Sequence, residues 1–172
     1  MNVGSGNKPP WTLPAKGKYS AFDSKRAQRH FAVTDFQTPD PFPILSLMVS
    51  CAQYTLNEFM WLTRWFQPQR AMTYIKATTP RDEFETAFEG MWQALWGRNE
   101  QISDPKVLAQ VLSRTFPAER VKSIMTAAAS PEYKQKLNES TQTALDRGAF
   151  GAPWFWVRNS TGQEEPFFGS DR

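Results

Sequence analysis

The alternation of apolar and polar residues predicts that the middle of the chain is helical. One apolar stripe recurs every three or four residues, which is the period of an α-helix with one buried face. The stripe consists of Phe84, Ala87, Phe88, Met91, Trp92, Leu95 and Trp96. We expect this helix to run from Pro80 to Trp96, with Thr79 as its N-cap and Gly97 at its end.

More helices are predicted on both sides of this one. The later ones are Asp104–Arg114, Pro117–Ala128 and Pro131–Arg147. Ser103 and Ser130 precede the first and the third of these as caps. Earlier in the chain we expect a short helix at Ala21–Phe31, whereas residues 1–19 are rich in Gly, Pro and Lys and indicate an irregular segment.

The pattern changes after Gly148, where a β-hairpin is predicted. Trp154–Val157 is a run of aromatic and β-branched residues, Asn159–Gly162 is a turn, and Glu164–Phe168 is the expected returning strand. The first strand is apolar on both faces, which is typical of a strand inside a larger sheet, and two strands alone are only marginally stable. We therefore expect a mostly helical α/β protein whose sheet partners are missing from this sequence.

Composition excludes several kinds of site. The 172 residues include one cysteine, Cys51, and one histidine, His30, so an internal disulfide, a CxxC pair and a Cys/His metal centre are excluded. Cys51 has no basic neighbour in the sequence that would activate its thiol. The net charge of +3 is spread along the chain without a basic run, so no nucleic-acid partner is expected. No apolar stretch has the length of a membrane span.

Two turns carry the candidate chemistry. In Gly148–Pro153 we predict a cis peptide bond between Ala152 and Pro153, which would turn the backbone N–H and C=O of Ala152 outward toward a peptide-like ligand. The alternative is an ordinary helix-to-strand turn. Ser170 and Asp171 indicate a helix start whose free N–H groups bind an anion, or else a plain cap without a ligand.

Other polar residues are weaker candidates. Asn7 offers donors and acceptors and Lys16 offers a cation, but their segment has no further mark of a site. Glu100 and Asp104 form a pair of carboxylates, as acid–base catalysis requires. They lie at a helix junction, where capping or solvation is the alternative.

Four segments together resemble the kappa-class glutathione transferases, a branch of the DsbA-like thioredoxin superfamily. These segments are SGNKPPWTLPAKGKY, LWGRNEQISDP, GAFGAPWFWV and FFGSDR. The resemblance implies a thioredoxin-like fold with a helical insertion. In that fold, residues 1–20 would be a remnant of the N-terminal half, 21–147 the helical insertion and 148–172 the C-terminal strands.

The resemblance also implies a site for glutathione as co-substrate, without a metal. The residues of this site would be Asn7, Lys16, Ala152, Pro153, Ser170 and Asp171. Ala152 would pair its backbone with the cysteinyl unit, Ser170 and Asp171 would hold the γ-glutamyl end, and Asn7 and Lys16 would reach the rest of the tripeptide. The implied activity is addition of the glutathione thiolate to an electrophile, or glutathione-dependent reduction of a peroxide.

The catalytic serine of this family lies just after its first strand, so we expect it upstream of Met1. The last helix of the family would lie beyond Arg172. We therefore expect this chain to be inactive as it stands, and the complete protein to be a homodimer in mitochondria or peroxisomes, with the cytoplasm as the alternative. The competing functions are a 2-hydroxychromene-2-carboxylate isomerase, which shares the GAFG-P and FGSDR motifs, and a non-catalytic fragment.

The stretch Val49–Gln67 interrupts the resemblance. The Val-Ser and Phe-Gln pairs at its ends can be encoded as a splice donor and a splice acceptor, so one interpretation is an unspliced intron. The other interpretation is a genuine inserted helix, because Leu56, Phe59, Met60, Thr63 and Phe66 have helical spacing.

Overall fold

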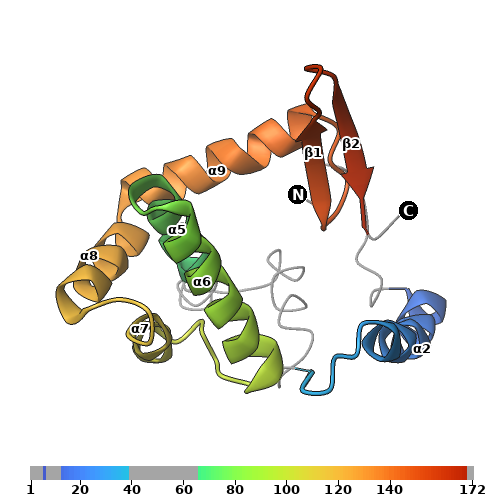
Figure 1. Cartoon of the computed structure of the whole chain (residues 1–172), viewed down its shortest axis with the longest axis horizontal. Helices are drawn as coiled ribbons and strands as arrows, with labels where there is room; N and C mark the ends of the chain where they lie inside the picture. The colour runs from blue at the N-terminus through green and yellow to red at the C-terminus, as the bar shows by residue number, and fades with distance from the viewer. Residues whose placement is uncertain (1–5, 7–12, 39–65, 170–172) are drawn as a thin grey trace, which may run out of the picture. The chain divides into compact units, whose positions relative to one another are not determined.

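The computed structural model of the chain describes residues 6, 13–38 and 66–169 (Figure 1). Its elements follow the predicted order of helices and then a hairpin. They are α2 (Pro14–His30), α5 (Gln67–Thr78), α6 (Arg81–Trp92), the π-helical turn η2 (Gln93–Gly97), α7 (Pro105–Leu112), α8 (Ala118–Ala129), α9 (Pro131–Asp146), β1 (Trp154–Arg158) and β2 (Glu164–Phe168).

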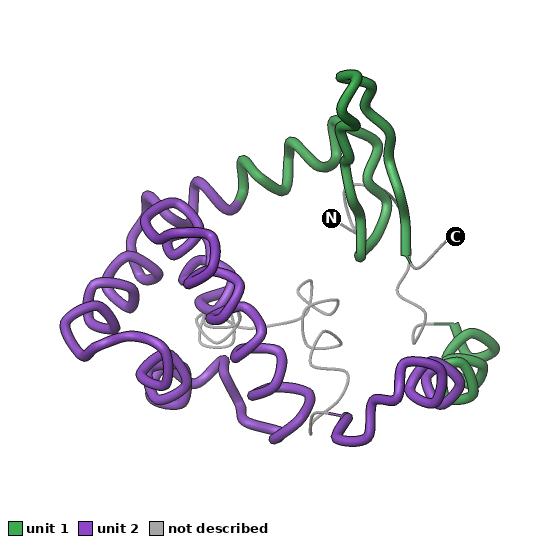
Figure 2. Tube along the Cα trace, in the orientation of Figure 1, with its two compact units in different colours: residues 1–23, 138–172 green, residues 24–137 purple. Residues whose placement is uncertain are grey.

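The chain divides into two compact units (Figure 2). Residues 24–137 form a helical unit, and residues 1–23 and 138–172 form a second unit, which contains the hairpin. Helices α2 and α9 each pass from one unit into the other.

The core of the helical unit lies among α5, α6, α7 and α8. Its largest fully buried side chains are Ile75, Leu108, Leu112 and Ile124. These apolar residues lie on one face of each helix, so their removal from water is the main force that holds the unit together.

Arg120 joins the end of α5 to the start of α8. Its Nη2 donates hydrogen bonds to the backbone oxygen of Thr78 at 2.9 Å and to the Thr78 Oγ1 at 2.7 Å. Its guanidinium carbon lies 5.1 Å from the centre of the Tyr74 ring. The same ring packs edge-on against Tyr133 of α9, with the ring centres 5.2 Å apart.

The predicted helix Pro80–Trp96 is shorter in the structure and ends differently. Thr79 is not its N-cap, because the Thr79 N–H and Oγ1 both donate to the Ile75 oxygen and so close α5. The α-helix stops at Trp92, and η2 follows it with a wider turn in which the Arg98 N–H donates to Gln93 O at 3.0 Å.

Two further features of the helices differ from the prediction. Helix α2 begins at Pro14 rather than near Ala21, so part of the segment predicted to be irregular is helical. Pro is well tolerated in a first helical turn, and one Gly within a helix weakens it without breaking it. Helix α5 was not predicted at all, and Gln67, the last residue of the interrupting stretch, is its first residue. The rest of that stretch, apart from Phe66, lies outside the described residues.

The remaining helices agree with prediction to within about two residues, the usual uncertainty of helix ends. One cap differs, because Asp104 rather than Ser103 is the N-cap of α7. The Asp104 Oδ1 accepts from the Lys106 N–H at 2.8 Å. Asp104 is therefore a cap, which is the alternative to acid–base catalysis that its position suggested.

The hairpin pairs β1 with β2 in antiparallel register, from Trp154 opposite Phe168 to Arg158 opposite Glu164. Asn159 closes the turn, because its Oδ1 accepts from the N–H groups of Thr161 and Gln163. In the described part of the chain the sheet has these two strands alone.

The described residues contain neither a candidate membrane span nor a candidate metal site. None of their helices is both long enough and apolar enough to cross a bilayer. They also bring together no group of three or more His, Cys, Asp or Glu side chains that could hold a metal ion.

Candidate functional site

The candidate site is the turn that joins α9 to β1. Gly148 ends α9 in the left-handed conformation, with φ of 83°, where a side chain would be strained. The N–H groups of Gly148 and Ala149 donate to the oxygens of Leu145 and Ala144, each at 2.9 Å, and satisfy the last carbonyls of the helix. Ala149 is buried, which fixes the start of the turn.

The peptide bond between Ala152 and Pro153 is cis, which confirms the prediction. Both residues are exposed. The Pro153 oxygen accepts from the Gly169 N–H at 2.9 Å, so the turn is joined to the far end of β2. Ser170, a predicted site residue, follows Gly169 in the sequence.

An aromatic cluster holds the turn against the hairpin. The Phe150 ring lies 4.4 Å from the Phe168 ring and 5.6 Å from the Trp154 ring, measured between centres. Trp154 and Phe168 are opposite each other in the register, so Phe150 contacts both strands at once. This role was not predictable from the sequence, because Phe168 reaches Phe150 and Trp154 only when the hairpin forms.

The hairpin leaves the outer edge of β1 open among the described residues. The hydrogen bonds that flank the ladder join Pro153 to Gly169 and Asn159 to Gln163. Because bonded and non-bonded pairs alternate in an antiparallel ladder, the N–H and C=O groups of Trp154 and Trp156 point away from β2. They run from the exposed Ala152–Pro153 turn along the strand, as an extended peptide ligand would require.

The same alternation places Pro166 on the outer edge of β2. Proline has no N–H to donate, and it is typical of an edge that does not accept another strand. The two edges of the hairpin are therefore chemically different, and β1 is the one suited to pairing.

Charge on the hairpin is balanced by local contacts. Glu164 accepts from the Trp156 Nε1 at 2.9 Å and from the Arg158 Nε at 2.8 Å. These two hydrogen bonds, Trp156 first, lower the pKa of Glu164. The Arg147 guanidinium lies 5.0 Å from the centre of the Trp156 ring. Because Glu164 stays ionised and bonded, it is a structural group and not a proton donor.

The remaining predicted site residues are not brought together by the described contacts. Lys16 is exposed in α2, and among the described residues its ammonium has no hydrogen-bond or ion-pair partner. Asn7, Ser170 and Asp171 lie outside the described residues.

Glu100 has a structural environment as well. It accepts from the Arg98 Nε at 2.7 Å and from the Arg114 Nη2 at 3.0 Å. Burial raises the pKa of this carboxyl, but the hydrogen bonds from Arg114 and Arg98 outweigh burial, and the net pKa is lowered. A carboxylate held ionised between two arginines is a poor general base, so the pairing with Asp104 does not form an acid–base site.

Sequence reasoning missed one exposed aromatic surface in the helical unit. Ring contacts run from Phe84 to Phe88, Trp92 and Trp96 along α6 and η2, and then to Phe36. Phe88 and Trp92 are exposed, although both were predicted to face the core. The aromatic stripe was visible in the sequence, but which of its residues the neighbouring helices cover was not.

Comparison with known proteins gives the class of this protein. The model of the DsbA-like thioredoxin domain matches residues 2–172, and the chain therefore belongs to the DsbA-like thioredoxin family.

Curated relatives specify the branch of this family. The chain is 33% identical over 171 residues to glutathione S-transferase kappa 1 of Homo sapiens, a match that covers 98% of the chain and 67% of the relative. It is 29% identical over 170 residues to glutathione S-transferase kappa 1 of Caenorhabditis elegans, with the same coverage of 98% and 67%. Glutathione S-transferase kappa 2 of that organism is 26% identical over 166 residues, or 95% of the chain and 65% of the relative. These matches confirm the resemblance to the kappa class, and the chain spans about two thirds of the length of these relatives.

Proposed function

We propose that the Ala152–Pro153 turn at the start of β1 forms part of a glutathione site, and that the complete protein is a glutathione transferase. The observation that carries this proposal is the exposed backbone of Ala152 and Pro153, in a chain whose relatives are named glutathione S-transferase kappa. Glutathione is a peptide, and an extended peptide binds an open strand edge through its backbone.

The site residues have separate tasks in this proposal. The backbone of Ala152 pairs with the cysteinyl unit and so sets the position of the sulfur. Ser170 and Asp171, which follow Gly169 in the sequence, hold the γ-glutamyl end. Asn7 and Lys16 reach the rest of the tripeptide, with Lys16 near a carboxylate.

The chemistry needs a bound thiolate and a positioned acceptor. The thiol loses its proton, the sulfur forms a bond to an electrophilic carbon, and the leaving group departs with the electron pair of the broken bond. Donors near the sulfur favour the thiolate, and orientation lowers the barrier further. With a peroxide as acceptor, the thiolate attacks oxygen, and the O–O bond breaks to give a glutathione sulfenic acid and, after protonation, an alcohol. The thiol of a second glutathione then attacks the sulfenic sulfur, and the disulfide forms with release of water.

The main donor to the sulfur in this proposal is a serine upstream of Met1. In this proposal the complete protein is a homodimer in mitochondria or peroxisomes and is the active form. No metal takes part.

The test compares the 172-residue chain with a form extended at both ends. Titration calorimetry measures glutathione binding, and a halonitrobenzene acceptor measures conjugation. We expect binding and conjugation to appear in the extended form alone. If the short chain conjugates glutathione at a similar rate, the serine-centred mechanism is wrong; if the extended form acts on a chromene carboxylate and not on the halonitrobenzene, the isomerase function replaces the transferase.

A further inference from the structure

The positive charge of the chain is concentrated in α2. This helix carries five Lys and Arg residues and one acid, Asp23, a formal charge of +4, while the whole chain has +3. The other residues therefore sum to −1, which corrects the expectation that the charge is spread along the chain. None of the helix residues is buried, so this charge is presented to solvent.

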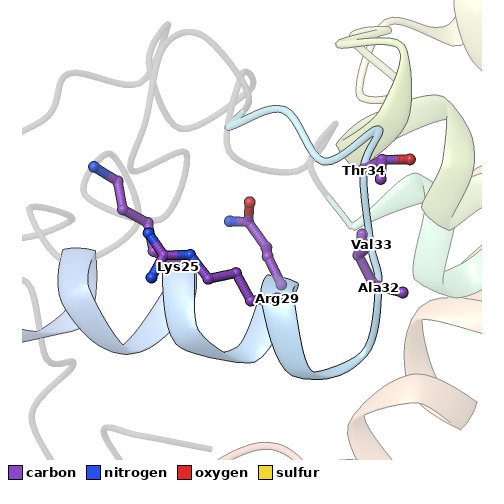
Figure 3. Close-up of a pocket in the computed structure, with 6 residues that line it drawn as sticks. Lys25, Arg29, Ala32, Val33 and Thr34 are labelled. Carbon is purple, nitrogen blue, oxygen red and sulfur yellow. The ribbon is translucent and has the colours of Figure 1, made fainter.

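A hollow of about 370 Å³ lies beside the C-terminal half of α2 and the loop after it. It is lined by Lys25, Gln28, Arg29, Ala32, Val33 and Thr34. Figure 3 shows the Lys25 and Arg29 side chains on the same side of the helix, with the Arg29 side chain directed toward Lys25, the Lys25 side chain directed away from the helix, and the loop residues following the helix end. None of the described residues that line the hollow is acidic, and the next acid along the loop, Asp35, has its carboxylate beside Gly97.

Lys25 and Arg29 are one helical turn apart, where two like charges destabilise a helix. Elsewhere in the helical unit this spacing joins opposite charges, as in Arg81 with Glu85 and Lys136 with Glu132. Neither Lys25 nor Arg29 has a hydrogen-bond or ion-pair partner for its charged group within residues 13–38 and 66–169. Among the described residues, no acid therefore relieves the repulsion between them.

Capping of the helix does not account for these two cations. The carbonyl oxygens of Ala27 and Gln28 accept from the N–H groups of Phe31 and Val33, each at 2.9 Å. Ala32 takes the left-handed conformation, with φ of 53°, that commonly ends a helix. Since backbone N–H groups satisfy these last carbonyls, the end of the helix does not engage the side chains of Lys25 and Arg29.

We propose that this hollow is a binding site for a phosphate group. A phosphate placed between the Lys25 ammonium and the Arg29 guanidinium relieves their repulsion and accepts charge-assisted hydrogen bonds from both. Arg supplies a planar fork of donors, Lys supplies a mobile point charge, and the Gln28 amide, which donates to Ser24 Oγ at 3.1 Å, has a second N–H for the same oxygens. This site is separate from the proposed glutathione site and does not depend on it.

The phosphate has two sources, a free phosphate compound or the headgroup of an anionic lipid. Phe31, next to the hollow in the chain, is 66% exposed and would enter the apolar part of a lipid surface. Replacing Phe31 therefore distinguishes the two sources, because a free phosphate does not need this ring.

The first arm titrates inorganic phosphate into the labelled 172-residue chain and follows the Arg29 Nε–H and the amides of residues 32–34 by NMR. The second arm measures sedimentation with vesicles of phosphatidylcholine, alone or mixed with phosphatidic acid. In whichever arm shows binding, we expect Lys25→Gln/Arg29→Gln to weaken the affinity for phosphate or for the vesicles about tenfold or more. A loss of this size corresponds to at least one charge-assisted hydrogen bond. Phe31→Ala should weaken the vesicle arm alone.

The control is Lys76→Gln/Lys106→Gln, which also lowers the net charge from +3 to +1 but lies in α5 and α7. Far-UV circular dichroism should show unchanged helix content in all variants. Saturable binding of phosphate identifies a free compound as the source, and binding to phosphatidic acid vesicles alone identifies a lipid. The proposal is overturned if neither arm binds, or if the control variant loses as much affinity as Lys25→Gln/Arg29→Gln.

Discussion

Replacement of Arg120 by alanine should destabilise the helical unit measurably. The change removes both hydrogen bonds to Thr78 and the contact with the Tyr74 ring that join the end of α5 to the start of α8. A hydrogen bond from a charged donor contributes about 1.5–3 kcal/mol, and a cation over an exposed ring about 0.5–1 kcal/mol. Arg120 is half-buried, so water recovers part of this, and we expect a loss of about 1–2 kcal/mol.

The assay is urea unfolding followed by far-UV circular dichroism, which reports mainly on the helices. Lys122→Ala is the matched control, because Lys122 is exposed on the same helix and its side chain has no such contacts. It should change the free energy of unfolding by less than about 0.5 kcal/mol. Thr78→Val completes a double-mutant cycle, and its effect should be smaller when Arg120 is already absent. The reasoning is refuted if Arg120→Ala costs no more than Lys122→Ala.

Three further predictions test other parts of the chain. Glu100→Gln should destabilise the protein at neutral pH but not in acid. The folded pKa of Glu100 lies below its ordinary 4.5, so the stability that the carboxylate contributes is complete above 4.5 and is lost as the pH falls through the folded pKa. Unfolding curves of both proteins over a pH series would show this dependence. In the extended form, Ser170→Ala and Asp171→Ala should raise the KM for glutathione more than they lower kcat, because they hold the part of the tripeptide far from the sulfur; equal losses in kcat and kcat/KM would contradict this in steady-state kinetics. Deletion of residues 49–67 should leave expression and thermal unfolding unharmed or improved if the stretch is an unspliced intron, and a large drop in Tm would favour a genuine helix.

Local signals in the sequence predicted much of the fold. The hairpin, the helices after Gly97 and the cis bond before Pro153 each depend on a few neighbouring residues, such as a cap, a Gly or a Pro. The π-helical turn was not predictable, because it depends on tertiary contacts in which Phe36 stacks on Trp96 and the Gln37 N–H donates to the Trp96 oxygen. Periodicity could not foresee these contacts, since they join segments far apart in the chain.

The candidate site shows the same division. The turn at Ala152 and Pro153 was predictable because consecutive residues form it. The contact of Phe150 with Trp154 and Phe168 was not, because it exists only when β2 returns beside β1. The hollow at α2 was missed for a different reason. The net charge of the whole chain does not reveal that α2 is strongly cationic, because the rest of the sequence is slightly acidic.

Pro166 limits how far these chains can associate through their hairpins. Two copies that pair β1 with β1 would form a four-stranded sheet related by a twofold axis, with a Pro166 on each outer side. Neither outer side could then accept a third copy by a regular ladder, because the proline interrupts its row of donors. Self-association through the two described strands alone should therefore stop at pairs and not grow into fibrils.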